Sequence, residues 1–449
     1  MALVSATDLP FLLTESRATP MHVGGLQVFE LPDGAPPGWL REQYEQMIAH
    51  DDIGTLFRRR PYRSLSTGYQ WAWREDDELD VEYHVRHSAL PEPGRVRELL
   101  ALGSRLHGTL LDRQRPLWEF HLIEGLEGDR FAAYTKVHHA MVDGVSAMRI
   151  LDRSLSTDPT EMGPPPWGSR PRPTSSDAEA KASVPNPVGA AVDVARGVLD
   201  VAGVTPALVR SARRAMQEEL AAFPFKAPPT MFNVHITGAR RIAADTWSLP
   251  RVKAVAKASG ATLNDIVLAM CSGALRRYLL EQGALPSESL TAMVPVSLRT
   301  DDSAGGNAVG AVITSLATDT AEPSWRLARV RESMQIAKDT MTGLSSAQLL
   351  AMSATNMIST PIMSLLGGGE GLRPPFNLTI SNVPGPRQTL YFNGARLQGV
   401  YPASIPYHGQ ALNITLNSYV DNLEIGLTGC RRRVPSLQRL LTHLEVSLE

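Results

Sequence analysis

The sequence predicts an α/β protein whose two halves are joined by a long polar connection. Strand-like and helix-like segments alternate before residue 157 and again after residue 230. Between them lies a Pro- and Ser-rich stretch without apolar periodicity, which is typical of a linker. A chain of 449 residues is long enough for two or three domains. We therefore expect a first half at 1–156, a linker with helices at 157–230 and a second half at 231–449.

The composition excludes several classes of function. Lys plus Arg is 44 and Asp plus Glu is 46, a formal charge of −2, so no charge excess is available to bind nucleic-acid phosphates. Two cysteines, Cys271 and Cys430, provide neither a disulfide framework nor a zinc cluster, which fits a reducing compartment. Asp8 and Pro10 interrupt the short apolar N-terminal run, so we expect mature sequence and no secretory signal. No window offers the roughly 20 strongly apolar residues of a transmembrane helix.

In the first half, the apolar periodicity predicts helices and strands in alternation. The predicted strands are 26–31, 118–123 and 131–137, and the predicted helices are 37–50, 94–111 and 146–155. The last two strands are expected to pair around a turn at Glu127-Gly128-Asp129.

The second half repeats this alternation. Strands are predicted at 291–296, 377–381, 412–420 and 423–427, and helices at 262–280, at 324–341 and after Pro435. Thr262 is the expected N-cap of the first helix, and Asp421-Asn422 the expected hairpin turn between the last strands. The helix at 324–341 is expected to be solvated. The uncharged stretch 340–369 is predicted to form a buried helix pair, or else a surface that faces lipid or an acyl chain.

The most informative segment is His138-His139-Ala140-Met141-Val142-Asp143-Gly144, where a predicted strand ends and a helix begins. Strand ends in α/β sheets expose reactive groups to a cleft. Two adjacent histidines in an extended chain point to opposite faces, so only one can face a given pocket. An imidazole, with a pKa of about 6.5, is a natural general base at neutral pH. We expect Asp143 to brace the turn or pair with an arginine, and Gly144 to allow a backbone conformation closed to other residues. A structural histidine pair or a metal site is the alternative, although no third ligand at helical spacing is present.

The motif His-His-x-x-x-Asp-Gly resembles the signature of the CoA-dependent acyltransferase superfamily, which includes chloramphenicol acetyltransferase and the condensation domains of peptide synthetases. Other segments resemble, in order and from about Asp8 to Arg432, the bacterial bifunctional wax ester synthase/acyl-CoA:diacylglycerol acyltransferases. These segments are Pro20-Met21-His22-Val23-Gly24-Gly25, Arg115-Pro116-Leu117-Trp118-Glu119, Leu263-Asn264-Asp265, Pro295-Val296-Ser297-Leu298-Arg299 and Ser381-Asn382-Val383-Pro384-Gly385-Pro386. The resemblance implies two chloramphenicol-acetyltransferase-like halves with the active site in a tunnel at their interface.

The resemblance also implies a mechanism. His139 is the expected general base, which takes the proton of a fatty alcohol or diacylglycerol hydroxyl so that the oxygen attacks the acyl-CoA thioester. Transfer is then direct, without an acyl-enzyme, and the chain has no Gly-x-Ser-x-Gly elbow. Acyl-CoA is a substrate, and no cofactor or metal is expected. His138 is expected to pack behind the site, and Asp143 to point away from it toward a basic partner, for which Arg299 is the candidate.

Six further positions are assigned to the substrate cleft: Pro116, Trp118, Asn264, Asp265, Ser381 and Asn382. Asn264 and Asp265 begin a helix, whose N–H groups could face a substrate carbonyl, or Asn264 could merely cap the helix. Pro116 and Trp118 are expected to shape the cleft floor or to be ordinary strand packing. The strand end at 381–382 is expected to position the second half beside the cleft.

Two arginine triplets, Arg58–Arg60 and Arg431–Arg433, are either solvated surface or contacts for anionic lipid heads or CoA phosphates. Lipidic substrates predict a peripheral protein at the cytoplasmic leaflet or on lipid inclusions. The alternative functions are a condensation-type amide synthase, which predicts a neighbouring carrier-protein domain, and a non-catalytic coat protein of lipid inclusions. The intact His139, Asp143 and Gly144 argue against the coat protein.

Overall fold

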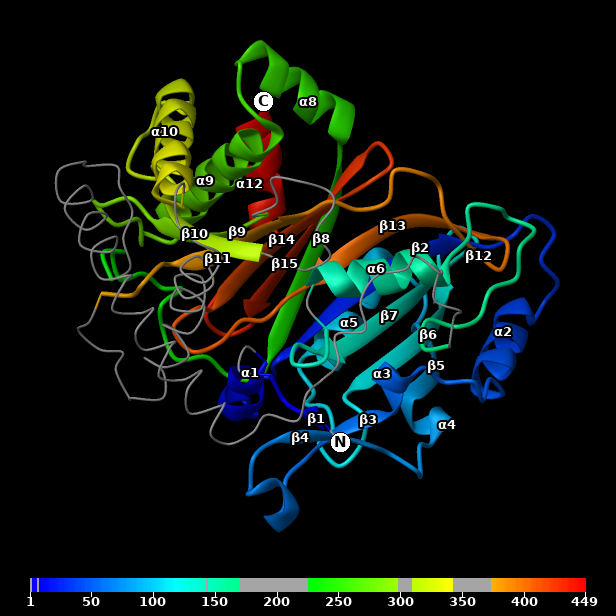
Figure 1. Ribbon diagram of the computed structural model, residues 1–449. Coiled ribbons are helices and arrows are strands. Elements are labelled where there is room, and N and C mark those ends of the chain that lie inside the picture. The colour runs from blue at the N-terminus through cyan, green and yellow to red at the C-terminus, as the bar shows by residue number, and fades with distance from the viewer. Residues whose placement is uncertain (1, 6–7, 143, 169–224, 298–308, 342–372) are drawn as a thin grey trace.

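The computed structural model describes residues 2–5, 8–142, 144–168, 225–297, 309–341 and 373–449 and confirms an α/β protein with two sheet-rich halves (Figure 1). Each half contains a six-stranded sheet, and the two sheets lie beside each other (Figure 1).

The sheet of the first half draws strands from both ends of the chain. Its order is β12 (Tyr391–Phe392), β13 (Ala395–Ala403), β2 (His22–Glu30), β7 (Arg130–His138), β6 (Trp118–Leu126) and β5 (Val85–Ala89). Strand β13 pairs antiparallel with β2 along almost its whole length, from Arg396 opposite Glu30 to Ala403 opposite Gly24. The two halves therefore share backbone hydrogen bonds and are not separable units.

The turn between β6 and β7 is the one expected from the sequence. Leu126 pairs with Arg130, and Gly128 and Asp129 take the left-handed φ values of 77° and 52°. The helices of this half are α1 (Leu9–Thr14), α2 (Trp39–Ile48), α3 (Thr55–Arg58), α4 (Val81–His84), α5 (Val96–His107) and α6 (Gly144–Ser154). A small separate sheet has the order β1 (Ala2–Leu3), β4 (Ala72–Glu75), β3 (Arg59–Tyr62), and a 3₁₀ turn, η1 (Leu65–Thr67), lies between β3 and β4.

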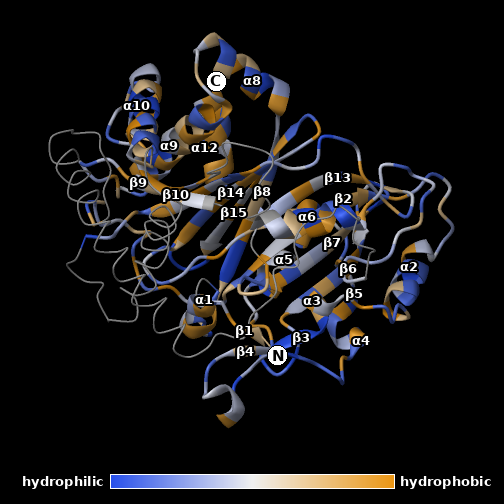
Figure 2. Ribbon diagram, viewed as in Figure 1, coloured by the Kyte–Doolittle hydropathy of each residue, from blue (hydrophilic) through white to orange (hydrophobic). Residues whose placement is uncertain are grey.

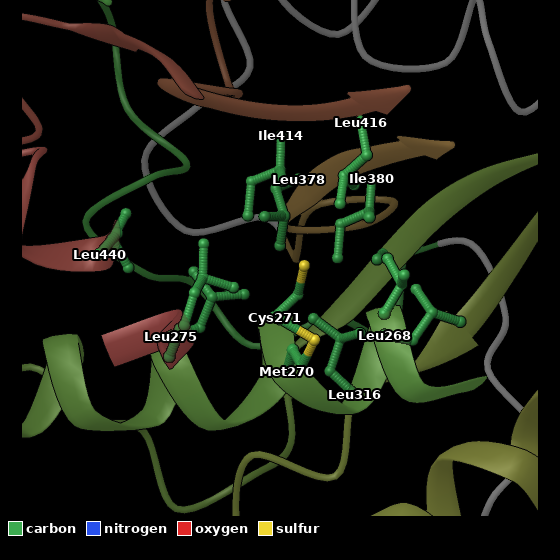
Figure 3. Close-up of a cluster of buried hydrophobic side chains, with 14 of the residues drawn as sticks. Leu268, Met270, Cys271, Leu275, Leu316, Leu378, Ile380, Ile414, Leu416 and Leu440 are labelled. Atoms are coloured by element: carbon green, nitrogen blue, oxygen red, sulfur yellow. The ribbon is translucent and has the colours of Figure 1, made fainter. Parts of the chain in front are cut away.

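The sheet of the second half surrounds a parallel centre. Its order is β10 (Val309–Ser315), β9 (Thr291–Ser297), β11 (Leu378–Val383), β14 (Leu412–Tyr419), β15 (Asn422–Cys430) and β8 (Arg240–Ser248), with β11 parallel to both neighbours. Its helices are α8 (Leu249–Ala258), α9 (Leu263–Glu281), α10 (Pro323–Met341) and α12 (Arg439–Leu448). These four helices cover the second-half sheet, whereas α5 of the first half packs against β8 of the second-half sheet (Figure 1). Figure 3 shows the core: Leu268, Cys271 and Leu275 of α9 point toward leucines and isoleucines of β11 and β14.

Three details differ from the sequence-based expectations. The hairpin turn is Val420-Asp421, not Asp421-Asn422, because Asn422 already pairs with Tyr419, and Val420 takes a φ of 51°. Helix α10 is not solvated all round, since Val330 and Met334 are buried against the second-half core. Trp167 lies inside the predicted linker, yet it is buried in the first half, so residues 157–168 belong to that half in space.

Two sequence predictions fall outside the described residues. They are the predicted helices of the linker, at residues 169–224, and the predicted buried helix pair or lipid-facing surface at 340–369, of which only residues 340 and 341 are described. Among the described helices, none is by itself long and apolar enough to cross a membrane, and the bent pair α8 and α9 passes that test only jointly.

Candidate active site

The histidine motif lies where strand β7 ends and helix α6 follows. His138 is the last residue of β7, and its N–H donates to the carbonyl of Leu117 at 2.9 Å. The chain then turns, with the Met141 N–H donating to the His138 carbonyl at 2.9 Å. Helix α6 begins at Gly144, so the strand–turn–helix arrangement expected around the motif is observed.

His139 is held by its backbone and by one face of its ring. Its N–H donates to the carbonyl of Met21, the residue just before β2, at 2.8 Å. Its half-buried imidazole stacks on Phe11 of α1, with ring centroids 4.1 Å apart and planes at 21°. Phe11 was not identified from the sequence, where the N-terminal apolar run was examined only as a targeting signal.

His138 points to the opposite side and is fully buried. Its Nδ1 accepts a hydrogen bond from the Ala140 N–H at 3.1 Å, so in a neutral ring the proton resides on Nε2. That Nε2 lies 3.4 Å from Oε1 of Glu15. His138 therefore lies behind His139, against a carboxylate.

Glu15 is a buried carboxylate just after α1 that sequence reasoning missed. Its Oε1 accepts from the Met21 N–H at 3.1 Å, and its Oε2 accepts from Arg113 Nε at 3.0 Å. Burial alone would raise the pKa of Glu15, but the contacts with His138, the Met21 amide and Arg113 outweigh it and lower the pKa. The carboxylate is therefore ionised at neutral pH.

A second layer of buried polar groups lies under α5 on the same sheet. Lys136 of β7 contacts Glu119 of β6 at 2.8 Å, and His121 contacts the same carboxylate oxygen at 3.2 Å. Burial would raise the pKa of Glu119, but these two partners hold it at about 2. Burial lowers the pKa of His107 to about 3, and this neutral ring contacts Tyr134 and the Ser404 carbonyl at 2.8 Å each.

Two residues of the predicted site cannot be placed. Asp143 and its suggested partner Arg299 lie outside the described residues, so their pairing stays a prediction. Gly144 is described, and its φ is not in the left-handed region. A Cβ added there would meet no atom of the described residues within 4 Å, so the expectation that this backbone excludes a side chain is wrong, and nothing in the described part of the chain explains the glycine.

Trp118 belongs to the core of the first half. Its indole stacks on His84 and Trp167, and its Nε1–H donates to the Phe57 carbonyl at 2.8 Å. Pro116 is buried beside it. Their neighbour Leu117 supplies the carbonyl that holds His138, so this segment supports the motif through its backbone.

The second-half positions lie at the start of α9 and the end of β11. Thr262 is the N-cap of α9, as expected, and the carboxylate of Asp265 accepts the Thr262 N–H at 2.9 Å in return. The cap is thus Thr262 and not Asn264, which is half-buried one residue before Asp265. Contact of these two with a substrate stays a prediction.

The segment after β11 brings the halves together beside the motif. Ser381 and Asn382 pair with Thr415 and Leu416 of β14, and the following turn reaches α6. A Cβ on Gly385 would lie 2.1 Å from the Ser418 carbonyl and 3.5 Å from Met148 of α6, so only glycine fits there. The second half therefore contacts α6, the helix that starts at the last residue of the histidine motif.

Among the described residues, no three His, Cys, Asp or Glu side chains are grouped as metal ligands. A cavity of about 350 Å³ opens at the far end of α6, lined by Asp152, Leu155, Glu161, Gln388 and Leu390 among others. None of its lining residues belongs to the histidine motif, so this cavity is not the expected tunnel, which stays a prediction.

Comparison with known proteins assigns nearly the whole chain. The family described as the wax ester synthase/diacylglycerol acyltransferase catalytic domain matches residues 4–267, and the WS/DGAT C-terminal domain matches residues 305–449.

Individual relatives are similar over their full length. The probable diacyglycerol O-acyltransferase tgs2 of Mycobacterium tuberculosis is 49% identical over 100% of this chain and 98% of its own. The O-acyltransferase WSD of Acinetobacter baylyi is 42% identical over 98% of this chain and 95% of its own. The solved wax ester synthase/diacylglycerol acyltransferase of Marinobacter aquaeolei VT8 has a TM-score of 0.78 at 41% identity, over 100% of this chain and 98% of that one. A condensation domain of the CDA synthetase, at 15% identity and a TM-score of 0.58, shares the fold.

Proposed function

The chain belongs to the wax ester synthase/diacylglycerol acyltransferase family, and from that premise we propose that it transfers a fatty acyl group from acyl-CoA to the hydroxyl of a long-chain alcohol or of diacylglycerol. The products are a wax ester or a triacylglycerol, and free CoA. The observation that carries the proposal is the placement of His139 at the end of β7, clamped through its N–H and stacked on Phe11.

In the proposed reaction His139 is the general base. Its imidazole takes the hydroxyl proton as the acceptor oxygen attacks the thioester carbonyl. The tetrahedral intermediate collapses, the carbon–sulfur bond breaks, and the imidazolium returns the proton to the CoA thiolate. The stacked Phe11 fixes the ring plane during this exchange.

Direct transfer, without an acyl-enzyme, agrees with the burial of both cysteines. Burial raises the pKa of Cys271 to about 12, so its thiol is not an activated nucleophile. Burial would also raise the pKa of Cys430, but hydrogen bonds with Thr237 and with the backbone at 432–433 lower it, so for this thiol the argument is burial alone. We propose that the reaction needs acyl-CoA and the acceptor only, with no added cofactor.

The test is acceptor-dependent thiol release. Palmitoyl-CoA with hexadecanol, or with a diacylglycerol, should release CoA thiol and form an equal amount of ester. The variant His139→Ala should lower kcat by about 10²–10⁴-fold, the usual contribution of positioned proton transfer. An unaltered rate in His139→Ala would refute the assignment of the base.

The alternatives give different results in the same assay. A condensation-type amide synthase would release thiol with an amine acceptor and not with an alcohol. A lipid-inclusion coat protein would bind lipid and release no thiol with any acceptor.

We also propose that the protein works while docked on a lipid surface, at the cytoplasmic leaflet or on lipid inclusions, through the β3–β4 hairpin and the outer side of α1. Leu65 and Tyr69 at the hairpin tip are 81% and 64% exposed, and Leu13 on α1 is 59% exposed. The segment 58–74 contains five arginines, of which Arg60 and Arg74 pair with Asp76 and Asp77 directly after it; the other three can complement anionic headgroups. The hairpin and α1 lie on the same side of the molecule (Figure 1), and the hairpin has an apolar tip (Figure 2).

The position of this surface fits the chemistry. Helix α1 presents Leu13 outward while its Phe11 stacks on His139, so a lipid acceptor would arrive close to the base. Within the hairpin, Arg63 lies over the Trp71 ring at 4.9 Å. Arginine and aromatic side chains in such contact are favoured at the headgroup level of a membrane.

Vesicle flotation tests the surface. The protein should float with phosphatidylcholine–phosphatidylglycerol vesicles and float less as salt rises. The double variant Leu65→Ser/Tyr69→Ser should lose flotation, whereas Trp325→Ser, which removes a 68% exposed aromatic residue from the second half, should keep it. Equal flotation of both variants would exclude the hairpin. Release of the protein by free CoA would show that the arginines bind CoA phosphates instead.

A further inference from the structure

Glu15 is connected to His139 in three ways: through the Met21 peptide, through the His138 ring and through helix α1. Its side chain is only 3% exposed, and Arg113, its cationic partner, also donates from Nη2 to the Leu12 carbonyl of α1 at 2.7 Å. A buried carboxylate is costly unless it is paired and hydrogen-bonded, and this one is both. Arg113 and Glu15 thereby fasten the C-terminal end of α1 to the body of the first half.

One connection from Glu15 to His139 runs through Met21. The Met21 N–H donates to Oε1 of Glu15 at 3.1 Å, and the Met21 carbonyl accepts the His139 N–H at 2.8 Å. The same peptide segment is thus held by Glu15 on one side and holds the base on the other. A shift of the carboxylate would move the acceptor of the His139 N–H.

A second connection runs through His138. Oε1 of Glu15 faces Nε2 of His138 at 3.4 Å, which favours the tautomer with the proton on Nε2. In this tautomer Nδ1 is free to accept the Ala140 N–H at 3.1 Å. The His138 ring therefore holds the Ala140 N–H on the other side of His139, and the Glu15 carboxylate sets the tautomer in which it does so.

The third connection is α1 itself. Phe11, one turn before Glu15, covers one face of the His139 imidazole at a centroid distance of 4.1 Å. Because Arg113 binds both Glu15 and the Leu12 carbonyl, the stacking ring is held by the same pair.

We infer that Glu15 is a positioning residue for His139, whose carboxylate fixes the strand end at 138–140, the Met21 carbonyl and the stacked helix α1 so that the imidazole is aimed at the reacting oxygen. The inference rests on the proposed function for the reaction that it serves. It assigns Glu15 no contact with the substrate, so its effect must pass through His139.

A double-mutant cycle separates this role from a purely structural one. Glu15→Gln keeps the size and one acceptor but removes the charge that Arg113 and His138 face. We expect a 10- to 100-fold lower kcat, with the KM for acyl-CoA changed less than about twofold. In a His139→Ala background the same substitution should cost nothing further, because the group that it positions is gone. The control is Glu445→Gln in the second half, whose carboxylate also accepts from an arginine and from one other N–H, that of Trp247, and which should leave kcat unchanged.

A wild-type rate in Glu15→Gln, or an equal loss with and without His139, would overturn the inference. A spectroscopic measurement makes the test independent of turnover. Histidine ring ¹⁵N signals should report the Nε2–H tautomer of His138 in the wild type, and the signals of both His138 and His139 should shift in Glu15→Gln. Unchanged His139 signals would reject the positioning role, whereas a wild-type protein without acceptor-dependent thiol release would reject only the proposed function.

Discussion

The two halves of the molecule use their interiors differently. The first half buries a series of titratable groups beside the histidine motif, among them Glu15, Glu119, Lys136 and His138. The second half packs α9 against β11 and β14 with an almost wholly apolar surface (Figure 3). Buried ion pairs seldom stabilise a protein more than apolar side chains of the same volume would. The charged groups buried beside the motif in the first half therefore serve geometry near the reacting group, and the apolar contacts of α9 in the second half serve stability, although the second half also buries the carboxylate of Glu424.

Breaking the buried ion pair of the first half should have the largest effect on stability. Lys136 is fully buried and donates to the carbonyls of Leu106 and Thr109 as well as to Glu119. Lys136→Met leaves the buried Glu119 charge with His121 and the partly exposed Arg86 but without its buried cation, and we expect a loss of about 3–5 kcal/mol in the free energy of unfolding. Urea denaturation measures it. The double variant Lys136→Met/Glu119→Gln should recover most of the loss, and a double variant no more stable than the single one would show that the charge is not the cause.

Truncating a core leucine of the second half should cost nearly as much stability and leave the chemistry intact. Leu275 of α9 is fully buried, so Leu275→Ala should lower the free energy of unfolding by about 2–5 kcal/mol. Well below its unfolding midpoint the variant should keep the wild-type kcat, measured by thiol release. A lower kcat in the folded variant would contradict the division of roles between the halves.

The elements that carry the motif could be predicted from the sequence because their signals are local. The alternation in β6 and β7 and the glycine turn between them are read within about twenty residues, and they place His138 and His139 at a strand end. Thr262 was identifiable as an N-cap from its position before an apolar helical run. Sequence resemblance then identified the family, which the comparisons confirm.

What could not be predicted depends on contacts between distant segments. The pairing of β13 with β2 joins residues more than three hundred and fifty positions apart, and nothing in the local pattern of either strand names its partner. Glu15 and Phe11 reach the motif across more than a hundred residues for the same reason. The error at Val420-Asp421 is one of register, since a strand can continue to a residue that its composition assigns to the turn.

The two halves also differ in a buried carboxylate: Glu119 of the first half has a cationic partner, whereas Glu424 of the second half has none among the described residues. The partners of Glu119 hold its pKa at about 2. Glu424 accepts hydrogen bonds from the Val400 N–H and from the Asn417 side chain, but its burial outweighs them and raises its pKa to about 8. Between the pKa of Glu424 in the unfolded chain and about pH 8, the folded state keeps a proton on Glu424 that the unfolded state releases. The contribution of Glu424 to stability therefore falls as pH rises through that window, by up to roughly 1.4 kcal/mol per pH unit.

Glu424→Gln should remove this dependence. Its free energy of unfolding should decline less than that of the wild type between about pH 5.5 and about pH 8. The stability contributed by the ionised Glu119, in contrast, is present above its unfolded pKa and is lost only as the pH falls toward about 2, so it is constant over this range. Parallel stability–pH curves for the wild type and Glu424→Gln would show that Glu424 does not hold its proton in the folded state.

The smallest effect on catalysis is expected at Cys271, a potential nucleophile that lies in the apolar core around α9. Its side chain lies among leucines and isoleucines of the core, and its raised pKa of about 12 keeps it protonated. Cys271→Ser should leave kcat unchanged while a hydroxyl in an apolar site lowers stability by about 1–3 kcal/mol, and Cys271→Ala should cost less because it buries no polar group. Maleimide should likewise leave the native enzyme active, since both cysteines are buried. If Cys271→Ser loses acyl transfer while it stays folded, or if an acyl group is recovered on Cys271 by mass spectrometry, then direct transfer at His139 is wrong and chemistry belongs to the second half as well.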